Sequence, residues 1–268
     1  MKALGVILKF WIIDDLYAAP YGRGVLNNLT GTPQYLSWLA RTLRPHIGDT
    51  VLEVGAGIGN IAARLISRRV LYVAAEKDPL HLHALRNRFL RTPNVVVQRV
   101  DPEVPQDIAG LENCFDTVLC LNVLEYLDDP GCVIGLLRST LKAGGSIVVL
   151  APHGTGLFGS LDRSLGHKRR FDSADLQRLL EVQGFTVEKM YSFNKMGTPP
   201  WWAYSRLTGS KNINKPVLKI FDKTVWIWRR IDRWVPWPGL SLILVARKPA
   251  GVNAADGVAA TCKLTAPA

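Results

Sequence analysis

The sequence lacks an apolar run of the roughly 20 residues that a membrane-spanning helix needs. It also lacks a C-x-x-C pair, because no two of its four cysteines, Cys114, Cys120, Cys132 and Cys262, are three residues apart. This spacing excludes a disulfide scaffold and a zinc site, and we expect no bound metal. The first three cysteines lie in or beside apolar runs, which predicts buried free thiols.

Acidic side chains are scarce relative to basic ones. The chain has 22 Asp and Glu against 33 Lys and Arg, a net charge of +11. A surplus of this size favours anionic partners, such as an acidic lipid surface, a phosphorylated substrate or a nucleic acid. A basic enzyme with no such partner remains the alternative.

The apolar run near the start of the sequence, residues 3–13, is too short to span a membrane. Lys9 interrupts this run, and Asp14 and Asp15 follow it. We interpret residues 1–26 as an amphipathic lead-in that packs on the domain or touches a membrane. We therefore expect a cytoplasmic protein, with peripheral contact to the inner membrane as a further expectation.

From residue 50 onward, β-branched runs alternate with helical patterns. The strand candidates are 50–54, 71–75, 95–100, 116–121, 146–151, 185–191 and 241–247. The helix candidates are 33–43, 60–68, 79–90, 130–141 and 173–183. The nearly continuous apolar character of the first five strands is typical of strands that are buried on both faces. This alternation predicts a doubly wound α/β sheet.

The strongest local signal follows the first of these strands. A buried strand runs into three glycines at alternate positions and then into a helical pattern, E-V-G-A-G-I-G-N. Glycine allows a ligand to approach the backbone without a Cβ in the way, and the helix offers unpaired N–H groups at the turn. The predicted cofactor loop consists of Glu53, Gly55, Ala56, Gly57, Gly59 and Asn60.

Two ligand classes use such a loop, and the side chains favour one of them. A dinucleotide prefers G-x-G-x-x-G, but the position three after Gly57 is Asn60. The carboxylate of Glu53 would repel a pyrophosphate and suits the cationic end of an amino acid. We therefore expect S-adenosylmethionine, which carries an ammonium and a sulfonium group, and NAD is the alternative.

An acidic residue, Glu76, follows the second strand. It lies about 20 residues beyond the glycines, which is the distance at which a carboxylate accepts the ribose hydroxyls of a nucleoside. A surface glutamate at a strand end is the alternative for an isolated residue. Because Glu76 accompanies the glycine loop, we predict the ribose contact and include its neighbour Lys77 in the site.

These residues resemble the first two motifs of the class I S-adenosylmethionine-dependent methyltransferases. Asp101 after the third strand resembles the third motif, which implies a hydrogen bond to the adenine amino group. The segment 115–125 resembles the fourth motif, so Asn122 and Val123 would line the methionine moiety. The resemblance spans residues 27–247. It implies a Rossmann-like, seven-stranded, mostly parallel sheet with a helical insertion before the last strand.

A narrower resemblance is to a bacterial, type 11/12-like subgroup in which G-H-x-R-R-[YF] follows the fifth strand. Residues 166–171 read G-H-K-R-R-F. Members of this subgroup often accompany glycosyltransferases that act on lipid-linked or surface sugars. The resemblance therefore implies a small molecule or a lipid-linked glycan as the acceptor.

The loop after the fourth strand excludes two subclasses of methyltransferase. Enzymes that methylate exocyclic base amines resemble one another in an Asn/Asp-Pro-Pro-aromatic loop, whereas residues 122–125 read N-V-L-E. Cytosine C5 enzymes need a catalytic cysteine in this loop, but Cys120 lies inside the strand. An RNA methyltransferase remains an alternative on net charge alone, and a nucleic acid is the less favoured partner.

Candidate catalytic residues follow the fifth strand, on the side where ligands bind in open α/β sheets. His153 and His167 are candidates for a general base or a substrate contact, and a structural role in the loop is the alternative. Arg169 and Arg170 are candidates to bind a phosphate or carboxylate on the substrate, with a solvated face as the alternative.

Residues 215–237 predict an amphipathic helix. Its apolar face contains Val217, Leu218, Ile220, Phe221, Val225, Trp228, Ile231 and Val235. Its charged face contains Lys219, Asp222, Lys223, Arg229, Arg230 and Arg233. We expect this helix to be a lid over the acceptor pocket, with Trp201 and Trp202 as tentative substrate contacts. A membrane interface and simple core packing are the alternatives, and Tyr21 or Tyr35 would cover the cofactor.

The predicted organisation is one catalytic core with an insertion. The core covers 27–193, the Trp-rich insertion 194–238, the last core strand 239–248 and a disordered tail 249–268. The predicted function is methyl transfer from S-adenosylmethionine to an O or N nucleophile. A module of the same fold that binds a membrane or a partner and has lost catalysis is the alternative from another class.

Overall fold

The computed structural model describes residues 31–207 and 215–250. The predicted lead-in at residues 1–26 and the predicted disorder beyond residue 250 fall outside the described residues, as do Tyr21 and Cys262. Within the described ranges, no helix combines the length and the apolar character that crossing a membrane requires.

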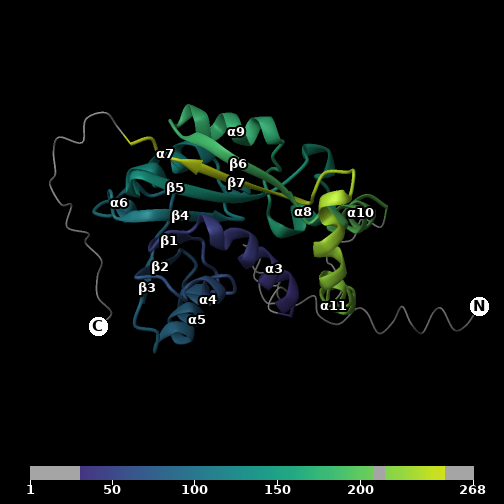
Figure 1. The fold of residues 1–268 in the computed structure, drawn as a ribbon, viewed down its shortest axis with the longest axis horizontal. Helices are drawn as coiled ribbons and strands as arrows, with labels where there is room; N and C mark the ends of the chain where they lie inside the picture. Colours follow the sequence, from purple (N-terminus) through teal and green to yellow (C-terminus); the bar gives the residue numbers. More distant parts are fainter. Residues whose placement is uncertain (1–30, 208–214, 251–268) are drawn as a thin grey trace, which may run out of the picture.

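A seven-stranded sheet organises the molecule, with the strand order β3-β2-β1-β4-β5-β7-β6 (Figure 1). The strands are β1 (Thr50–Val54), β2 (Leu71–Glu76), β3 (Val95–Arg99), β4 (Phe115–Leu121), β5 (Leu141–Pro152), β6 (Thr186–Phe193) and β7 (Ser241–Arg247). The first five strands pair in parallel, and β7 is antiparallel to both β5 and β6. This topology confirms the predicted α/β class and the doubly wound, mostly parallel sheet.

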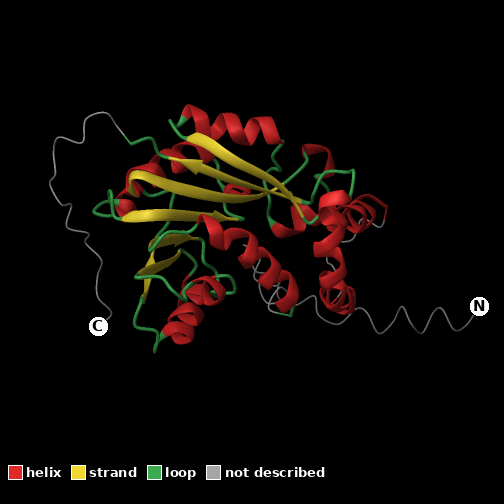
Figure 2. Ribbon diagram, viewed as in Figure 1, coloured by secondary structure: helices red, strands yellow, loops and turns green. Residues whose placement is uncertain are grey.

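Helices cover both faces of the sheet, as Figure 2 shows. The helices on one face are α3 (Pro33–Leu43), α4 (Ala62–Leu65) and α5 (Pro79–Phe89), and those on the other are α6 (Pro105–Ile108), α7 (Pro130–Thr140) and α9 (Ser173–Val182). Each set buries its apolar side chains in a separate core, one around Leu43, Leu65 and Leu85 and the other around Leu137 and Leu176. Burial on both faces explains why the central strands are apolar throughout.

Local signals set the helix ends close to where the sequence predicts them. Asp78 caps α5 by accepting hydrogen bonds from the N–H groups of Leu80 and His81, and Pro79 occupies the first turn, where its missing N–H is not needed. Asp129 and Pro130 start α7 in the same way. The helix predicted at 60–68 is shorter than expected, because only the four residues of α4 are α-helical.

The strand register brings the loops of the site together. Val54 at the end of β1 is level with Ala75 in β2 and with Cys120 in β4. The chain therefore leaves β1, β2 and β4 at the same edge of the sheet, and the loops that follow these strands are neighbours. In open α/β sheets this carboxyl edge is where ligands bind.

The segment between β6 and β7 crosses in front of that edge. It contains α10 (Thr198–Trp202), a short π-helix (Ala203–Leu207), α11 (Lys215–Ile231) and a 3₁₀ turn (Asp232–Trp234). α8 (Ser160–Leu165), which follows β5, lies beside α10 in Figure 1. α11 packs against α3, and Phe221 meets the ring of Tyr35 at 6.1 Å between centroids.

The predicted faces of the 215–237 helix are wrong at three positions. Asp222, which we predicted on the charged face, is buried and accepts a 2.9 Å hydrogen bond from the N–H of Tyr35 at the start of α3. Ile220 and Ile231, which we predicted on the apolar face, are exposed. The N-terminus of a helix leaves backbone N–H groups unpaired. The buried carboxylate of Asp222 on α11 pairs with one such group at the start of the neighbouring α3.

The prediction of buried thiols is confirmed for one of the three cysteines that the structure describes. Cys120 is buried in β4, Cys114 is half-buried and Cys132 is exposed near the start of α7. Burial raises the pKa of the Cys120 thiol further above its ordinary value. This thiol therefore stays protonated and packs as a small apolar side chain.

Candidate active site

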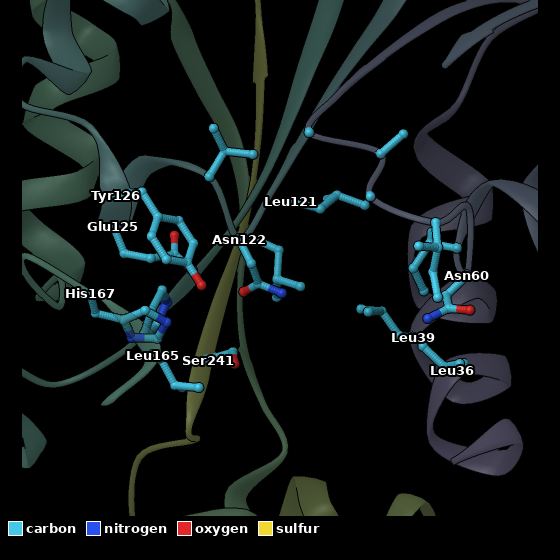
Figure 3. Close-up of a pocket in the computed structure, with 18 of the residues that line it drawn as sticks. Leu36, Leu39, Asn60, Leu121, Asn122, Glu125, Tyr126, Leu165, His167 and Ser241 are labelled. Atoms are coloured by element: carbon cyan, nitrogen blue, oxygen red, sulfur yellow. The ribbon is translucent and has the colours of Figure 1, made fainter. Parts of the chain in front are cut away.

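A cavity of about 650 Å³ lies along the carboxyl edge of the sheet. Its lining comes from the ends of β1, β2 and β4 and from α3, α10 and α11. In the close-up, one side of the cavity carries Leu36, Leu39 and Asn60, the opposite side carries Glu125, Tyr126 and His167, and Leu121 and Asn122 lie between them (Figure 3).

The glycine loop turns on left-handed backbone. Gly55, Gly57 and Gly59 have φ values of 70°, 58° and 78°, a region that costs other residues about 1–2 kcal/mol. A Cβ on Gly55 would lie 2.5 Å from Cγ2 of Val123, so the loops after β1 and β4 pack too closely for a larger residue. A Cβ on Gly59 would instead meet Phe89 of α5 at 2.7 Å, and Gly59 is not part of the cavity lining.

Glu76 ends β2, and its carboxylate binds the backbone of the loops that follow β1 and β2. Its Oε2 accepts a 2.8 Å hydrogen bond from the N–H of Gly57. Its Oε1 accepts hydrogen bonds from the N–H groups of Lys77 and Asp78, at 2.8 and 2.9 Å. A carboxylate oxygen has two acceptor positions, so Oε2 retains one for a ligand. Glu76 is buried yet lines the cavity, as a ribose-binding carboxylate must.

Glu53 near the end of β1 is a second buried carboxyl group in the lining. It accepts a 2.7 Å hydrogen bond from the hydroxyl of Tyr72 on β2. Burial raises the pKa of Glu53 to about 7; the hydrogen bond from Tyr72 opposes this rise and the charge of Glu76 adds to it. A ligand cation would favour the ionised form, so cation binding and proton loss at Glu53 are linked.

Asp101 and Asn122 complete this half of the cavity. Asp101 follows β3, and its Oδ1 lies 3.5 Å from the Nζ of Lys77. Asn122 follows β4 in a left-handed conformation with φ of 54°, which asparagine tolerates better than most residues. Both residues line the cavity, and so do Lys77 and Val123.

The donor set of this half fits a cationic amino-acid nucleoside. Glu53, Glu76 and Asp101 come from the ends of three adjacent strands and line the same cavity. They supply acceptors for ribose hydroxyls and for an amino group, and negative charge for an ammonium group. The same charges would repel a pyrophosphate. In the described chain, no three His, Cys, Asp or Glu side chains are arranged to hold a metal ion.

The other half of the cavity is built around the buried carboxylate of Asp162 on α8. Its Oδ1 lies 3.0 Å from Nδ1 of His167 and accepts a 2.8 Å hydrogen bond from Nε of Arg170. Its Oδ2 accepts a hydrogen bond from the N–H of Gly159. Burial alone would raise the pKa of Asp162, but the hydrogen bond from His167 and the charge of Arg170 lower it below its ordinary value. This ion network holds His167 and Arg170 in the lining.

Arg170 also connects the network to the segment before β7. Its Nη1 donates a 2.8 Å hydrogen bond to the carbonyl of His153, and its guanidinium lies 4.7 Å from the ring centroid of Trp201. Trp201 lines the cavity, and its buried Nε1 has no hydrogen-bond partner among the described residues. A charged group stacked on the indole fixes the ring at the cavity wall.

Three of the predicted catalytic and substrate-binding residues lie outside the cavity lining. His153 is held in the loop by contacts of Nδ1 with the Gly239 carbonyl at 3.1 Å and of Nε2 with Ser173 Oγ at 3.4 Å. Arg169 donates to the carbonyls of Leu127 and Asp128. Trp202 is exposed and is not part of the cavity lining. The structure thus brings His167, Arg170 and Trp201 together without these three.

Glu125, Tyr126 and Asp162 are not among the predicted site residues, but they lie in or beside the cavity. Glu125 and Tyr126 occupy a 3₁₀ turn, Leu124–Tyr126, directly after β4. A single acidic residue inside the apolar run V-L-E-Y-L at the carboxyl edge of the sheet was the available signal for Glu125. Tyr35 lines the cavity, whereas its alternative Tyr21 lies outside the described residues.

Comparison with known proteins agrees with this geometry. The family model described as "Methyltransferase domain" matches residues 52–147. An uncharacterised methyltransferase of Mycobacterium tuberculosis is 29% identical over 130 residues, which are 48% of this chain and 50% of that protein. The ubiquinone biosynthesis O-methyltransferase of Acinetobacter baylyi is 29% identical over 119 residues, 43% of this chain and 48% of that protein. The matches therefore span about half the length of these curated relatives.

Among solved structures, the crystal structure of a SAM-dependent methyltransferase from Archaeoglobus fulgidus superposes with a TM-score of 0.58. The two chains are 18% identical, and the superposition covers 84% of this chain and all of the other. At 18% identity, the similarity of the two structures shows a shared fold and nothing about activity. The sheet order and the loop after β1 define the class I methyltransferase fold. With the methyltransferase-domain match over residues 52–147, they support a class I methyltransferase.

Proposed function

We propose that the protein transfers a methyl group from S-adenosylmethionine to an O or N nucleophile of a small molecule or a lipid-linked glycan. The observation that carries this proposal is the set of three carboxyl groups, Glu53, Glu76 and Asp101, that line one cavity beside the glycine loop. Their charge suits a ligand with an ammonium group and no phosphate. The match of residues 52–147 to the methyltransferase-domain model supports the same reaction class.

When bound, S-adenosylmethionine supplies an already activated methyl group on a sulfonium centre, so the protein has mainly to position the reactants and exclude water. Glu76 would hold the ribose, Asp101 the adenine and Glu53 the ammonium group. Asn122 lies between this half and the half that contains His167 (Figure 3), and Val123 also lines the cavity. The acceptor would then occupy the part of the cavity lined by His167, Arg170 and Trp201.

The test is calorimetry of the full chain with S-adenosylhomocysteine, and NAD serves as the matched dinucleotide control. We expect one binding site for S-adenosylhomocysteine and no heat of binding for NAD. No binding of S-adenosylhomocysteine at millimolar concentration would refute the proposal. A crystal with the diphosphate of NAD seated on the glycine loop would refute it as well.

A second candidate function, binding to an anionic lipid surface, is favoured by the outer face of α10, α11 and the turn after them. Four tryptophans are exposed there, Trp202, Trp226, Trp234 and Trp237. Exposed basic residues of the same segment are Lys219, Lys223, Arg229, Arg230 and Arg233. Trp with Lys and Arg is the composition of proteins that lie on a membrane interface. Since α11 also lines the cavity, membrane contact would bring a lipid-linked acceptor to its entrance.

Co-sedimentation with vesicles tests this surface. We expect the protein to pellet with vesicles of phosphatidylcholine and phosphatidylglycerol, and less with phosphatidylcholine alone. The double variant Trp226→Ser/Trp234→Ser should lose most of this binding. The control variant Leu90→Ser/Val182→Ser removes two exposed apolar side chains elsewhere and should bind normally. Equal pelleting of the two double variants would exclude the segment as a membrane contact.

A further inference from the structure

One buried carboxyl group in the cavity has no partner in the structure. Glu125 is fully buried, it lines the cavity, and neither of its carboxyl oxygens has a hydrogen-bond partner among the described residues. Leaving a buried polar group unpaired is costly, and native proteins rarely do so without a functional reason. The arrangement suggests that a ligand supplies the missing partner.

The backbone holds Glu125 firmly in this place. It is the middle residue of the 3₁₀ turn after β4, where the N–H of Tyr126 donates to the carbonyl of Val123. The carbonyl of Glu125 itself accepts a 2.8 Å hydrogen bond from the N–H of Lys168. These two hydrogen bonds fix the backbone of the turn that carries Glu125.

The surroundings of Glu125 raise the pKa of its carboxyl group, which is therefore protonated and neutral over a wider pH range than an exposed glutamate. Burial raises the pKa of Glu125 to about 8; its own backbone N–H and the charge of Arg170 oppose this rise, and the charge of Asp162 adds to it. Arg170 and Asp162 are paired at 2.8 Å, so their charges act on Glu125 in opposite directions. Burial also keeps Tyr126 and Cys120 protonated, since it raises the pKa of both.

A second unpaired group lies in the same half of the cavity. The buried Nε1 of Trp201 is a donor without a described partner, and the ring is fixed by Arg170. Glu125 and Trp201 thus add one acceptor and one donor to the lining of the cavity. A hydroxyl group can satisfy both, because it donates one hydrogen bond and accepts two.

We propose that Glu125 binds the acceptor hydroxyl and takes its proton during methyl transfer, so that the acceptor is an alcohol or a phenol. This inference rests on the proposed function and narrows its O or N nucleophile to oxygen. As the O–H bond breaks, the oxygen forms its bond to the methyl carbon and the carbon–sulfur bond breaks. The proton stays on the Glu125 carboxyl group, and the sulfur keeps the electron pair as a neutral thioether.

The charges of the site favour oxygen over nitrogen. An amine enters as an ammonium ion at neutral pH, and it would meet both the sulfonium group and Arg170. A hydroxyl group is neutral and needs a base to become a good nucleophile. The sulfonium charge would stabilise the ionised form of Glu125, so cofactor binding would prepare the base.

Infrared difference spectroscopy of the full chain tests the proposal without an acceptor. The carbonyl band of a protonated carboxyl group should be present at pH 6 and titrate away with a midpoint near pH 8, and subtraction of the Glu125→Gln spectrum isolates it. Glu53→Gln is the matched control, because Glu53 titrates near pH 7 and must not account for the same band. A Glu125 band that disappears below pH 6 would overturn the proposal.

Two ligands that differ by one charge sharpen the test. S-adenosylmethionine should move the Glu125 titration at least one pH unit lower, whereas S-adenosylhomocysteine, a neutral thioether, should move it much less. Equal effects of both bound ligands would overturn the inference while leaving the proposed function intact. If neither ligand binds, the proposed function fails instead. Should Glu125→Gln not fold, the comparison of the two ligands in the wild type still decides.

A matched pair of probes tests the acceptor class. 2-Phenylethanol should shift the Glu125 band of the complex with S-adenosylhomocysteine, and 2-phenylethylamine should not. The Glu125→Gln variant should respond to neither probe in this band, although it should bind S-adenosylhomocysteine within about twofold of the wild type. A band shift with the amine alone, or with neither probe at the solubility limit, would overturn the assignment.

Discussion

The carboxylate of Glu76 accepts a 2.8 Å hydrogen bond from the backbone N–H of Gly57, which joins the end of β2 to the glycine loop after β1. One side chain therefore fixes the loop and presents an acceptor in the cavity. The strand register makes this contact possible, because Glu53 and Val54 of β1 are level with Ala74 and Ala75 of β2. The charged residue that the site needs for a ligand also holds the site in shape.

Glu76→Ala should weaken the binding of S-adenosylhomocysteine about tenfold to a hundredfold. The ribose would lose a hydrogen bond to a charged acceptor, worth about 1.5–3 kcal/mol, and the Gly57 N–H would lose its partner. Calorimetry measures the effect. Glu181→Ala, on the exposed face of α9, is the control and should bind normally. Unchanged affinity of Glu76→Ala would show that this carboxylate does not hold the nucleoside.

A comparison of Gly55→Ala, in the glycine loop, with Gly144→Ala, in β5, separates the cost of backbone strain from the cost of a clash with Val123. Both glycines are left-handed, with φ values of 70° and 75°, but a Cβ on Gly144 meets nothing within 4 Å. We expect Gly144→Ala to cost about 1–2 kcal/mol of folding free energy from strain alone. Gly55→Ala should cost more and should reduce affinity for S-adenosylhomocysteine, because Val123 must move. Urea unfolding and calorimetry on both variants test this, and equal losses would contradict it.

The affinity for S-adenosylhomocysteine should rise with pH around neutrality. Burial raises the pKa of Glu53 to about 7, and its ionised form is the one that attracts the ligand's ammonium group. Between pH 6 and pH 8 the ionised fraction grows from about a tenth to about nine tenths, so affinity should grow by up to about tenfold. Glu53→Gln should abolish this rise. A pH-independent affinity in the wild type would place the ammonium group elsewhere.

Asp162→Asn should destabilise the protein by about 3–5 kcal/mol, because Arg170 would remain buried without its counter-charge. The variant should also release His167 from the lining. Urea unfolding measures the loss. Asp128→Asn is the matched control, since its ion pair with Lys168 is exposed, and it should leave the stability unchanged. A stable Asp162→Asn variant would mean that the network does not organise this half of the cavity.

Asp162 should also make the free energy of unfolding decrease at acidic pH. The pKa of Asp162 is lower in the folded state than its ordinary value of about 3.9. Its contribution is therefore complete above that value and is lost as the pH falls through the lower folded pKa. Thermal unfolding between pH 5 and pH 2 should show a steeper decline in the wild type than in Asp162→Asn. If the stability of both proteins declined in parallel, groups other than Asp162 would cause the loss of stability at acidic pH.

The sheet could be predicted well from the sequence, because strands that are buried on both faces consist of nearly continuous apolar residues. β1 and β7 have the bounds that the apolar runs predict, and α3 has the bounds of its helical pattern. The ligand loop was equally readable, since glycine spacing and the strand-end carboxylates are local features. Of the predicted cofactor residues, only Gly59 lies outside the cavity lining.

The acceptor half was predicted less well because its residues are assembled across the chain. Asp162 on α8, Arg170 before α9 and Trp201 on α10 meet only after the segment between β6 and β7 has folded across the sheet edge. The histidine positions looked alike in sequence, but His153 is held by backbone and Ser173, and only His167 reaches the cavity. Asp222 was misplaced for the same reason, since its partner is the start of α3.

The sequence by itself determined the sheet, the left-handed loop and the carboxylates that follow β1, β2 and β3, because each depends on the order and type of neighbouring residues. The tertiary structure alone decided which polar groups are buried and whether they are paired. Glu125 shows the difference. In the sequence it is one acidic residue in an apolar loop, whereas in the fold it is a fully buried carboxyl group without a described partner, in the wall of a cavity. Burial and pairing depend on elements distant in the chain, and no local pattern encodes them.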